Sequence, residues 1–174
     1  MKKRYYIAYG SNLNKEQMKR RCPGSKCTGI SILEDWKLMF KGSKTGSYLT
    51  IEKSKGDIVP VGIWSVTNED EQKLDMYEGY PTFYYKKDLK VNLINTNGKK
   101  KESISCFVYI MQEDRPYGMP FDGYIKTCTD GYRDFGFDTK YLIAALENTA
   151  EEVKKDEEGY AGTNDEEDVP CVWM

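Results

Sequence analysis

The chain has 174 residues, with 26 Lys and Arg against 28 Asp and Glu, and a mean hydropathy of −0.71. These values are typical of one globular domain with a core of its own. The sequence contains no histidine, which excludes Ser-His-Asp and Cys-His catalytic pairs, His-containing zinc sites and imidazole proton shuttles. Any acid–base chemistry must therefore use a carboxylate, a Lys, a Tyr or a Cys.

The charges and cysteines narrow the class of protein further. The formal net charge of −2 and the lack of a long Lys/Arg stripe argue against nucleic acid as a partner. The cysteines are odd in number and irregularly spaced, so they predict reduced thiols rather than a metal site. They are Cys22, Cys27, Cys106, Cys128 and Cys171.

No segment predicts insertion into a membrane. The basic start, Met1–Arg4, precedes an apolar run that stops at Gly10, too short for a signal peptide. No stretch approaches the roughly 20 apolar residues of a membrane span. We therefore expect a cytoplasmic protein without a membrane partner.

The first half of the chain predicts mainly strands. Arg4–Tyr9 predicts a strand broken at Gly10, and Asn14–Arg21 a polar helix with Asn14 as N-cap. Ile30–Phe40 begins a β-rich stretch with alternating apolar residues. Two short strands follow, separated by a turn at Gly56-Asp57: Tyr48–Glu52 and Val59–Val66.

A helix and a hairpin are predicted next. Asn68–Met76 resembles a short helix capped by Asn68. Phe83–Ile94 and Lys101–Met111 have strongly β-type patterns, and the Asn97-Gly98 pair between them is a strong hairpin signal.

The last third predicts helices at Asp122–Tyr132 and Asp138–Lys155. We expect one α+β domain over residues 1–155 and an acidic, solvated tail over 156–174. The apolar end, Val169–Met174, either frays or docks on the body of the protein or on a second copy, as in a homodimer.

The segment from Tyr9 to Leu13 (Tyr-Gly-Ser-Asn-Leu) lies where a strand ends and a helix is about to begin. Successive backbone N–H groups in such a turn can cradle a carboxylate or an oxyanion. Gly10 allows close approach of a ligand, and Ser11 and Asn12 add side-chain donors. The alternative is an ordinary turn with a Ser or Asx cap.

Glu78 is a candidate general acid/base. It lies at the predicted end of a helix, before a Gly and a Pro, and aromatic residues surround it in sequence. A carboxylate in an aromatic pocket loses solvation, which raises its pKa toward the range useful for proton transfer. The alternative is a surface Glu in a loop.

Together these segments resemble the γ-glutamylcyclotransferase family, the AIG2-like or butirosin-biosynthesis-like cyclotransferases. The resemblance rests on the Tyr-Gly-Ser-Asn-Leu loop, on Leu-Asp-x-x-Glu-Gly at Leu74–Gly79, on the strand Phe107–Met111 and on the order of the C-terminal helices. It implies a small mixed β-barrel flanked by helices. It also implies an enzyme that cyclises the γ-glutamyl group of a γ-glutamyl-amino acid or related amide to 5-oxoproline.

The resemblance also implies roles for individual residues. Glu78 would be the general acid/base, and the loop Tyr9, Gly10, Ser11, Asn12, Leu13 would hold the γ-glutamyl moiety. Tyr109 resembles the family's pocket tyrosine, and Tyr85, which follows Glu78 by seven positions, is a second candidate. The expected partner is a small γ-glutamyl substrate, with no cofactor and no metal.

Two alternatives remain open at this point. The first is a cyclotransferase of the same fold for a γ-glutamylamine or a secondary-metabolite conjugate. Enzymes for γ-glutamylamines tend to carry Tyr-Gly-Thr-Leu, so the Ser-Asn-Leu version here favours γ-glutamyl-amino acids. The second is a non-catalytic module that binds a γ-glutamyl ligand.

Overall fold

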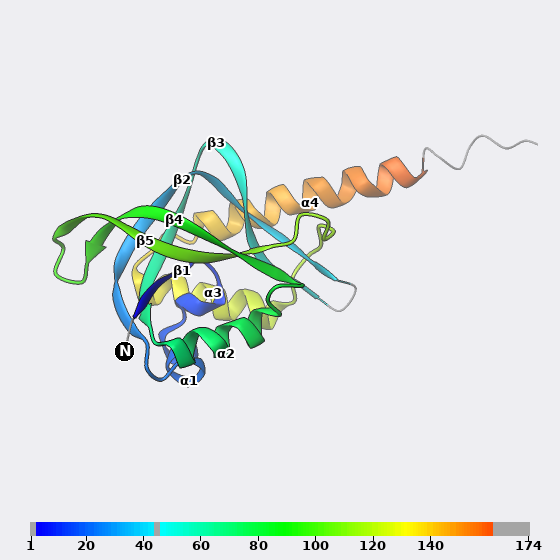
Figure 1. The fold of residues 1–174 in the computed structure, drawn as a ribbon. Coiled ribbons are helices and arrows are strands. Elements are labelled where there is room, and N and C mark those ends of the chain that lie inside the picture. Colours follow the sequence, from blue (N-terminus) through cyan, green and yellow to red (C-terminus); the bar gives the residue numbers. More distant parts are fainter. Residues whose placement is uncertain (1–2, 44–45, 162–174) are drawn as a thin grey trace, which may run out of the picture.

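A closed β-barrel forms the centre of the computed structural model, which describes residues 3–43 and 46–161 (Figure 1). The strands follow the order β1-β3-β2-β4-β5 around the barrel. β1 and β5 pair in parallel, and the other pairs are antiparallel. The strands are β1 (Arg4–Ala8), β2 (Lys26–Ser43), β3 (Gly46–Val66), β4 (Tyr84–Asn95) and β5 (Lys100–Met111). The barrel closes because β1 joins β3 on one side and β5 on the other.

The predicted turn at Gly56-Asp57 is wrong, because β3 runs through these residues without a break. Trp36 pairs with Lys53 and Glu34 pairs with Ile58, so the extra residues of the bulge belong to β3. Residues 54–57 lie opposite the single residue Asp35, which has a φ of 62°. The Asp35 carboxylate accepts a hydrogen bond from the Gly56 N–H (2.8 Å). A bulge lets paired strands bend together while the ladder continues, so what resembles a turn in sequence is a bend in one long hairpin.

The hairpin predicted at Asn97-Gly98 is confirmed. β4 and β5 pair antiparallel on either side of it. Gly98 has a φ of 73°, and the Asn95 side chain accepts hydrogen bonds from the Asn97 and Lys99 N–H groups. The left-handed conformation at Gly98 is one that glycine adopts without strain.

Helices flank the barrel (Figure 1). They are η1 (Ser11–Leu13, a 3₁₀ turn), α1 (Lys15–Arg21), α2 (Asn68–Glu78), α3 (Asp122–Phe135) and α4 (Lys140–Ala161). Asn14 caps α1 as predicted, since its side chain accepts from the Gln17 N–H (2.9 Å). The predicted cap Asn68 is wrong, because Thr67 caps α2. Thr67 and Asp70 form a capping box, in which the side chain of each residue accepts a hydrogen bond from the backbone N–H of the other.

α4 extends beyond the predicted end at Lys155 to Ala161. The additional residues include Glu157 and Glu158, which are favourable helix formers. The rest of the acidic segment, with Cys171 and Val169–Met174, lies outside the described residues, and the division at residue 155 stays a prediction. Within the described part, none of the helices is long and apolar enough to cross a membrane.

Fully buried side chains from every layer meet in one core. The barrel contributes Ile7, Phe40, Leu49, Ile63 and Phe107, and the helices contribute Met18, Leu74 and Tyr132. α4 packs over β2, where Thr149 Oγ1 accepts from the Phe40 N–H (3.0 Å). This cover explains why the burial of β2 is continuous from Leu38 to Gly42 rather than alternating.

α3 packs directly on the backbone that follows β1. A β-carbon added at Gly131 of α3 would lie 2.6 Å from the Asn14 nitrogen and 2.8 Å from the Leu13 carbonyl carbon. Only a residue without a side chain permits this approach. The contact fixes the position of the Gly10–Asn14 loop against the barrel.

We expect Gly131→Ala to lower the free energy of unfolding by about 1–3 kcal/mol, because the methyl group must push α3 away from the loop. Urea denaturation checks this. The control is Gly159→Ala in α4, where a β-carbon meets nothing within 4 Å; it should leave the stability unchanged or raise it slightly. Equal stabilities of the two variants would contradict the close packing of α3 on the loop.

Candidate active site

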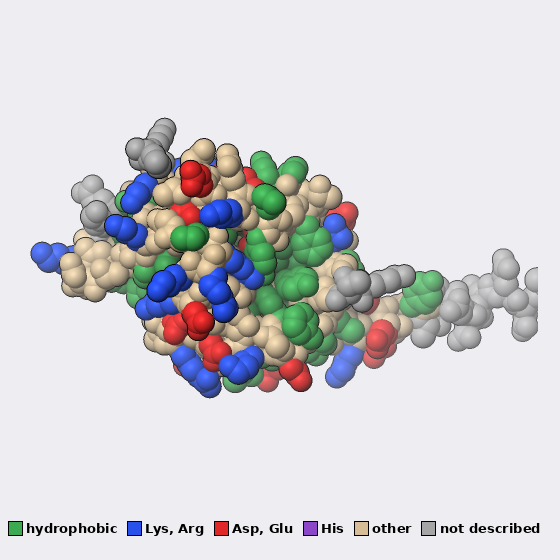
Figure 2. Space-filling view, turned by 90° about the horizontal axis from the view of Figure 1, so that it is seen from below, with side chains coloured by type: hydrophobic (Ala, Val, Ile, Leu, Met, Phe, Trp, Pro, Cys, Tyr) green, Lys and Arg blue, Asp and Glu red, His purple; other side chains and the backbone are tan. Residues whose placement is uncertain are grey.

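A cavity of about 410 Å³ lies between the C-terminal end of α2, the loop that follows β1, and the barrel. It opens among hydrophobic side chains that gather on the face carrying α1 and α2 (Figure 2). Seven of the chain's 14 tyrosines line it. The lining residues include Tyr6, Tyr9, Tyr48, Tyr77, Tyr84, Tyr109 and Tyr124, together with Phe83, Met76 and Leu49. Glu78 is the acid among these mainly aromatic walls.

Glu78 faces the cavity because α2 ends at that residue. Gly79 adopts the left-handed conformation (φ 62°, ψ 36°), and its N–H bonds back to the carbonyls of Asp75 and Met76. This arrangement terminates the helix. The carboxylate therefore lies at the negative end of the helix dipole, a position that disfavours its ionised form.

The surroundings of Glu78 shift its proton affinity. Burial raises the pKa of Glu78 to about 7, and the charge of Arg21 and the hydrogen bond from Asn12 only partly oppose this. A carboxyl group with a pKa near 7 can both accept and return a proton at neutral pH.

The loop Gly10–Asn12 forms another wall of the cavity. In the 3₁₀ turn, the Leu13 N–H bonds to the Gly10 carbonyl (3.0 Å) and the Asn14 N–H to the Ser11 carbonyl (3.1 Å). The N–H groups of Ser11 and Asn12 precede the first closed turn and so have no partner within the helix. They supply backbone donors beside the cavity.

Asn12 connects the loop to the carboxylate. Its amide nitrogen donates to Glu78 Oε1 (3.2 Å) and to the Tyr6 hydroxyl (3.0 Å). Its amide oxygen accepts from Arg21 Nη1 (2.6 Å). The side chain is buried, so each of these polar atoms needs the partner that it has.

The buried tyrosines are held by backbone atoms. The Tyr9 hydroxyl donates to the Tyr109 carbonyl (2.7 Å), and the Tyr84 hydroxyl donates to the Leu49 carbonyl (2.8 Å). The Tyr124 hydroxyl accepts from the Leu49 N–H (3.1 Å). Burial raises the pKa of Tyr9, Tyr84 and Tyr124 well above 10, so these phenols stay neutral.

Two of the predicted site residues lie away from the cavity. Leu13 is fully buried in the core. Tyr85 donates to Glu113 Oε1 (2.5 Å), and it is Tyr84 that lines the cavity. Neighbouring residues of a strand point to opposite faces, so Tyr84 and Tyr85 cannot both face the same pocket. Tyr9, Gly10, Ser11, Asn12, Glu78 and Tyr109 are brought together around it.

Several lining residues are not predicted as site residues from the sequence, namely Tyr6, Tyr48 and Tyr124. In sequence these aromatic residues look like ordinary core residues, so nothing distinguishes them as cavity residues. Phe83 and Tyr84, which also line the cavity, are among the aromatic residues that surround Glu78 in sequence. The sequence also gives no reason to single out Arg21, whose side chain contacts Asn12 from α1, over the adjacent Arg20.

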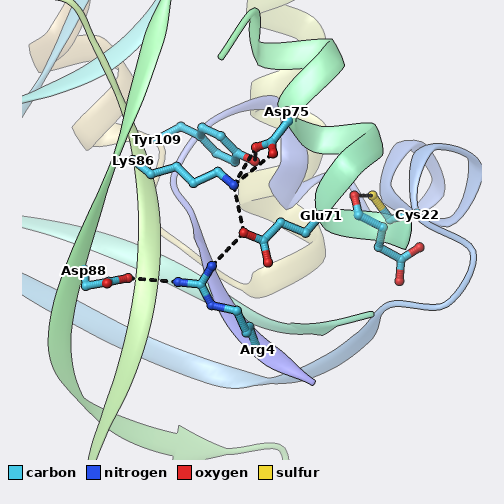
Figure 3. A network of polar contacts seen from close by, with 8 residues as sticks. Arg4, Cys22, Glu71, Asp75, Lys86, Asp88 and Tyr109 are labelled. Carbon is cyan, nitrogen blue, oxygen red and sulfur yellow. Dashed lines mark hydrogen bonds and ion pairs between the residues drawn. The ribbon is translucent and has the colours of Figure 1, made fainter. Parts of the chain in front are cut away.

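A network of polar contacts fastens α2 to three strands (Figure 3). The Tyr109 hydroxyl of β5 donates to Asp75 Oδ1 (2.6 Å), and Lys86 Nζ of β4 lies 2.7 Å from the same oxygen. Lys86 also bonds Glu71 Oε1 (2.7 Å), which Arg4 of β1 contacts at 2.6 Å. The network sets the distance between α2 and the barrel, and hence the place of the helix end that carries the acid.

The comparisons with known proteins agree with this site. A model of the family "Gamma-glutamyl cyclotransferase, AIG2-like" matches residues 6–125, which include the loop, the acid and most of the barrel. The chain belongs to this family. The resemblance seen in the sequence is thereby confirmed.

Relatives of this cyclotransferase-family chain include the human and bovine proteins named gamma-glutamylcyclotransferase. Each is 32% identical over 145 residues, covering 78% of this chain and 73% of the relative. A solved structure named gamma-glutamyl cyclotransferase has a TM-score of 0.67 at 29% identity and covers 83% of this chain and 86% of its own. YkqA from Bacillus subtilis shares the fold, with a TM-score of 0.66 at 15% identity. The predicted α+β barrel flanked by helices is confirmed.

The raised pKa of Glu78 in this family member has a consequence for stability. Because the folded state holds the proton more tightly than the unfolded chain, ionising Glu78 opposes folding as the pH rises from about 4.5 through about 7. Replacing it by Gln removes that cost. We expect the stability of Glu78→Gln relative to the parent to increase by roughly 3 kcal/mol between pH 4.5 and pH 8.

Urea denaturation across this pH range tests the expectation. Glu34→Gln, at an exposed strand position, is the matched control and should track the parent. A Glu78→Gln difference that does not change with pH would show that the carboxyl group ionises in the folded protein as it does in water.

Proposed function

We propose that this protein cyclises the γ-glutamyl group of a γ-glutamyl-amino acid to 5-oxoproline and releases the amino acid, with Glu78 as the proton carrier. The observation that carries the proposal is the position of the Glu78 carboxylate beside the Ser11 and Asn12 donors in one cavity. Family membership supplies the reaction class, and the geometry supports the roles of the residues.

The reaction needs no nucleophile from the protein. The α-amino nitrogen of the substrate attacks its own γ-carbonyl carbon, and a lactam ring closes as the new C–N bond forms. Such an intramolecular attack requires mainly that the substrate be held in its folded conformation. A cavity of about 410 Å³ with mainly aromatic walls can impose that conformation.

Glu78 would move the protons that the reaction requires. Its carboxylate takes a proton from the α-ammonium group, which frees the nitrogen for attack. After the tetrahedral intermediate forms, the same group gives that proton to the departing nitrogen, the old C–N bond breaks, and the amino acid leaves as its free amine. The regenerated carboxylate then takes the second proton from the ring nitrogen, which leaves the neutral lactam, and passes it to the released amine. A pKa near 7 suits both steps, because neither protonation state is strongly favoured.

The loop would stabilise the developing negative charge. The N–H groups of Ser11 and Asn12 lie at the start of a turn and lack intrahelical partners. Backbone donors aimed at a tetrahedral oxyanion are a common and strong form of catalysis. This chemistry requires neither a metal nor a cofactor, and it requires no imidazole.

We also propose that the enzyme works in the cytoplasm. The four cysteines in the described part, Cys22, Cys27, Cys106 and Cys128, are free thiols. Free thiols in this number are typical of a reducing compartment. A homodimer through Val169–Met174 stays a prediction.

We expect Glu78→Gln to lower kcat/KM by about 10²–10⁴-fold, because Gln keeps the shape of the side chain but cannot carry a proton. In the parent, kcat/KM should rise with pH through an apparent pKa near 7 as the carboxylate forms. Release of 5-oxoproline measures both effects. Glu69→Gln, on the exposed first turn of the same helix, is the control and should retain the parent's activity. Parent-like turnover by Glu78→Gln would remove Glu78 from the mechanism.

A substrate panel separates the remaining alternatives. We expect γ-glutamyl-alanine and γ-glutamyl-phenylalanine to be turned over at least tenfold faster, as kcat/KM, than the matched γ-glutamylamines that lack the carboxylate; the tenfold difference corresponds to about 1.4 kcal/mol. The reverse order would assign the protein to γ-glutamylamines or other conjugates. Binding without turnover across the whole panel would favour the non-catalytic module.

A further inference from the structure

We propose that Arg21 is a positioning residue: it fixes the orientation of the Asn12 amide and thereby holds the Glu78 carboxylate in the cavity. The kinetic part of this inference rests on the proposed function, whereas the structural and electrostatic parts do not.

Arg21 contacts the site residue Asn12 from outside the cavity. It is the last residue of α1, half-buried, and it is not among the residues that line the cavity. Its guanidinium carbon lies 3.3 Å from the centre of the Tyr77 ring, and Nη1 lies 2.6 Å from Asn12 Oδ1. The side chain is therefore held by a stacked ring on one side and by an amide oxygen on the other.

The hydrogen-bonding capacities of the groups impose one orientation on Asn12. A guanidinium has only donors, an ionised carboxylate has only acceptors, and an amide has one end of each kind. With the oxygen of Asn12 toward Arg21, its NH₂ group points to Glu78 and to Tyr6. A flipped amide would set donor against donor at Arg21 and acceptor against acceptor at Glu78.

The charge of Arg21 also acts on Glu78 through this short chain of contacts. Around the carboxylate, the other titratable groups of the described residues are neutral near pH 7, since burial raises the pKa of the phenols and raises that of the Cys22 thiol to about 11. These groups are Tyr6 and Tyr9 from β1 and its end, Tyr77 from α2, Tyr84 from β4, Tyr109 from β5, Tyr124 from α3, and Cys22 after α1. Arg21 is the cation that lowers the pKa of Glu78.

The adjacent Arg20 provides a matched control. It lies on the same helix, is exposed, and pairs with Glu16 at 3.4 Å on the surface. Arg20→Met removes the same charge from the same helix without touching Asn12. Any effect that arises only from the net charge of α1 should therefore be shared by variants at both positions.

The first measurement is a ¹³C NMR titration of the glutamate side-chain carboxyls, with the Glu78 signal assigned by its absence in Glu78→Gln. We expect Arg21→Met to raise the pKa of Glu78 by about one pH unit and Arg20→Met to leave it unchanged. If Arg21→Met does not fold, Arg21→Gln replaces it, because Gln keeps an N–H donor for Asn12 while removing the charge. Should Glu78 titrate in Arg21→Gln and in any folded Arg21→Met as it does in the parent, the inference is overturned.

The second measurement is kinetic. Removing Arg21 should lower kcat by about 10- to 100-fold, the size of one lost charge-assisted hydrogen bond, with KM changed less than kcat. The acid limb of kcat/KM should move to higher pH along with the NMR titration. A rise in KM with unchanged kcat and an unchanged pH profile of kcat/KM would reject the positioning role. A parent that lacks turnover would instead reject the proposed function and leave the NMR result standing.

Discussion

Glu78 ends α2 with its carboxylate inside a largely aromatic cavity, and the free energy needed to ionise it there is the constraint on which the rest of the site depends. An isolated carboxylate in such surroundings would simply stay protonated. The Asn12 amide and the Arg21 guanidinium lower that cost without removing it. The result is a group balanced between its two protonation states at neutral pH.

That balance requires fixed distances, and the fold supplies them from two directions. On one side, Asp75, Lys86 and Tyr109 hold α2 against the barrel (Figure 3). On the other, Gly131 of α3 packs on the backbone of the loop that carries Asn12. The acid and its donor thus belong to separate elements, and each element is held in place by its own contacts with the rest of the fold. A carboxylate and an amide on a flexible loop would not keep a stable hydrogen bond.

The sequence contains enough information to place the main chemical groups. The Tyr-Gly-Ser-Asn-Leu segment marks a strand end with free donors, and Glu78 before Gly79 marks a helix end, so both can be identified from local rules. The fold follows in outline for the same reason, since the Asn97-Gly98 hairpin and the Asn14 cap are local features. Local rules are not always sufficient, since the cap of α2 is also a local feature and is Thr67 rather than the predicted Asn68.

The other errors arise where a contact between residues far apart in the chain determines the structure. Gly56 resembles a turn in sequence, but it lies in a bulge of β3 that pairs opposite Asp35, a residue far away in the chain. Tyr85 and Tyr84 are equivalent in sequence, and only the register of β4 determines which one faces the cavity. Arg21 differs from Arg20 only in its angle around α1, and its importance appears once Asn12 and Tyr77 are seen beside it.

In the proposed reaction Glu78 is the single proton carrier, and the chain contains no histidine that could share this role. The proposed reaction can proceed with one proton carrier, because the nucleophile belongs to the substrate and backbone N–H groups stabilise the oxyanion. The proposed reaction therefore depends on how a γ-glutamyl group lies relative to Glu78 and to the loop. A substrate in any other orientation would separate the carboxylate from the nitrogen atoms whose protons it must move.

The most direct test is a crystal structure of the Glu78→Gln variant with an intact γ-glutamyl-amino acid bound. The account predicts the α-amino nitrogen within hydrogen-bond distance of the residue 78 side chain, and the γ-carbonyl oxygen facing the Ser11 and Asn12 N–H groups. A γ-glutamyl group bound outside the cavity, or one with its α-amino group turned away from residue 78, would contradict it.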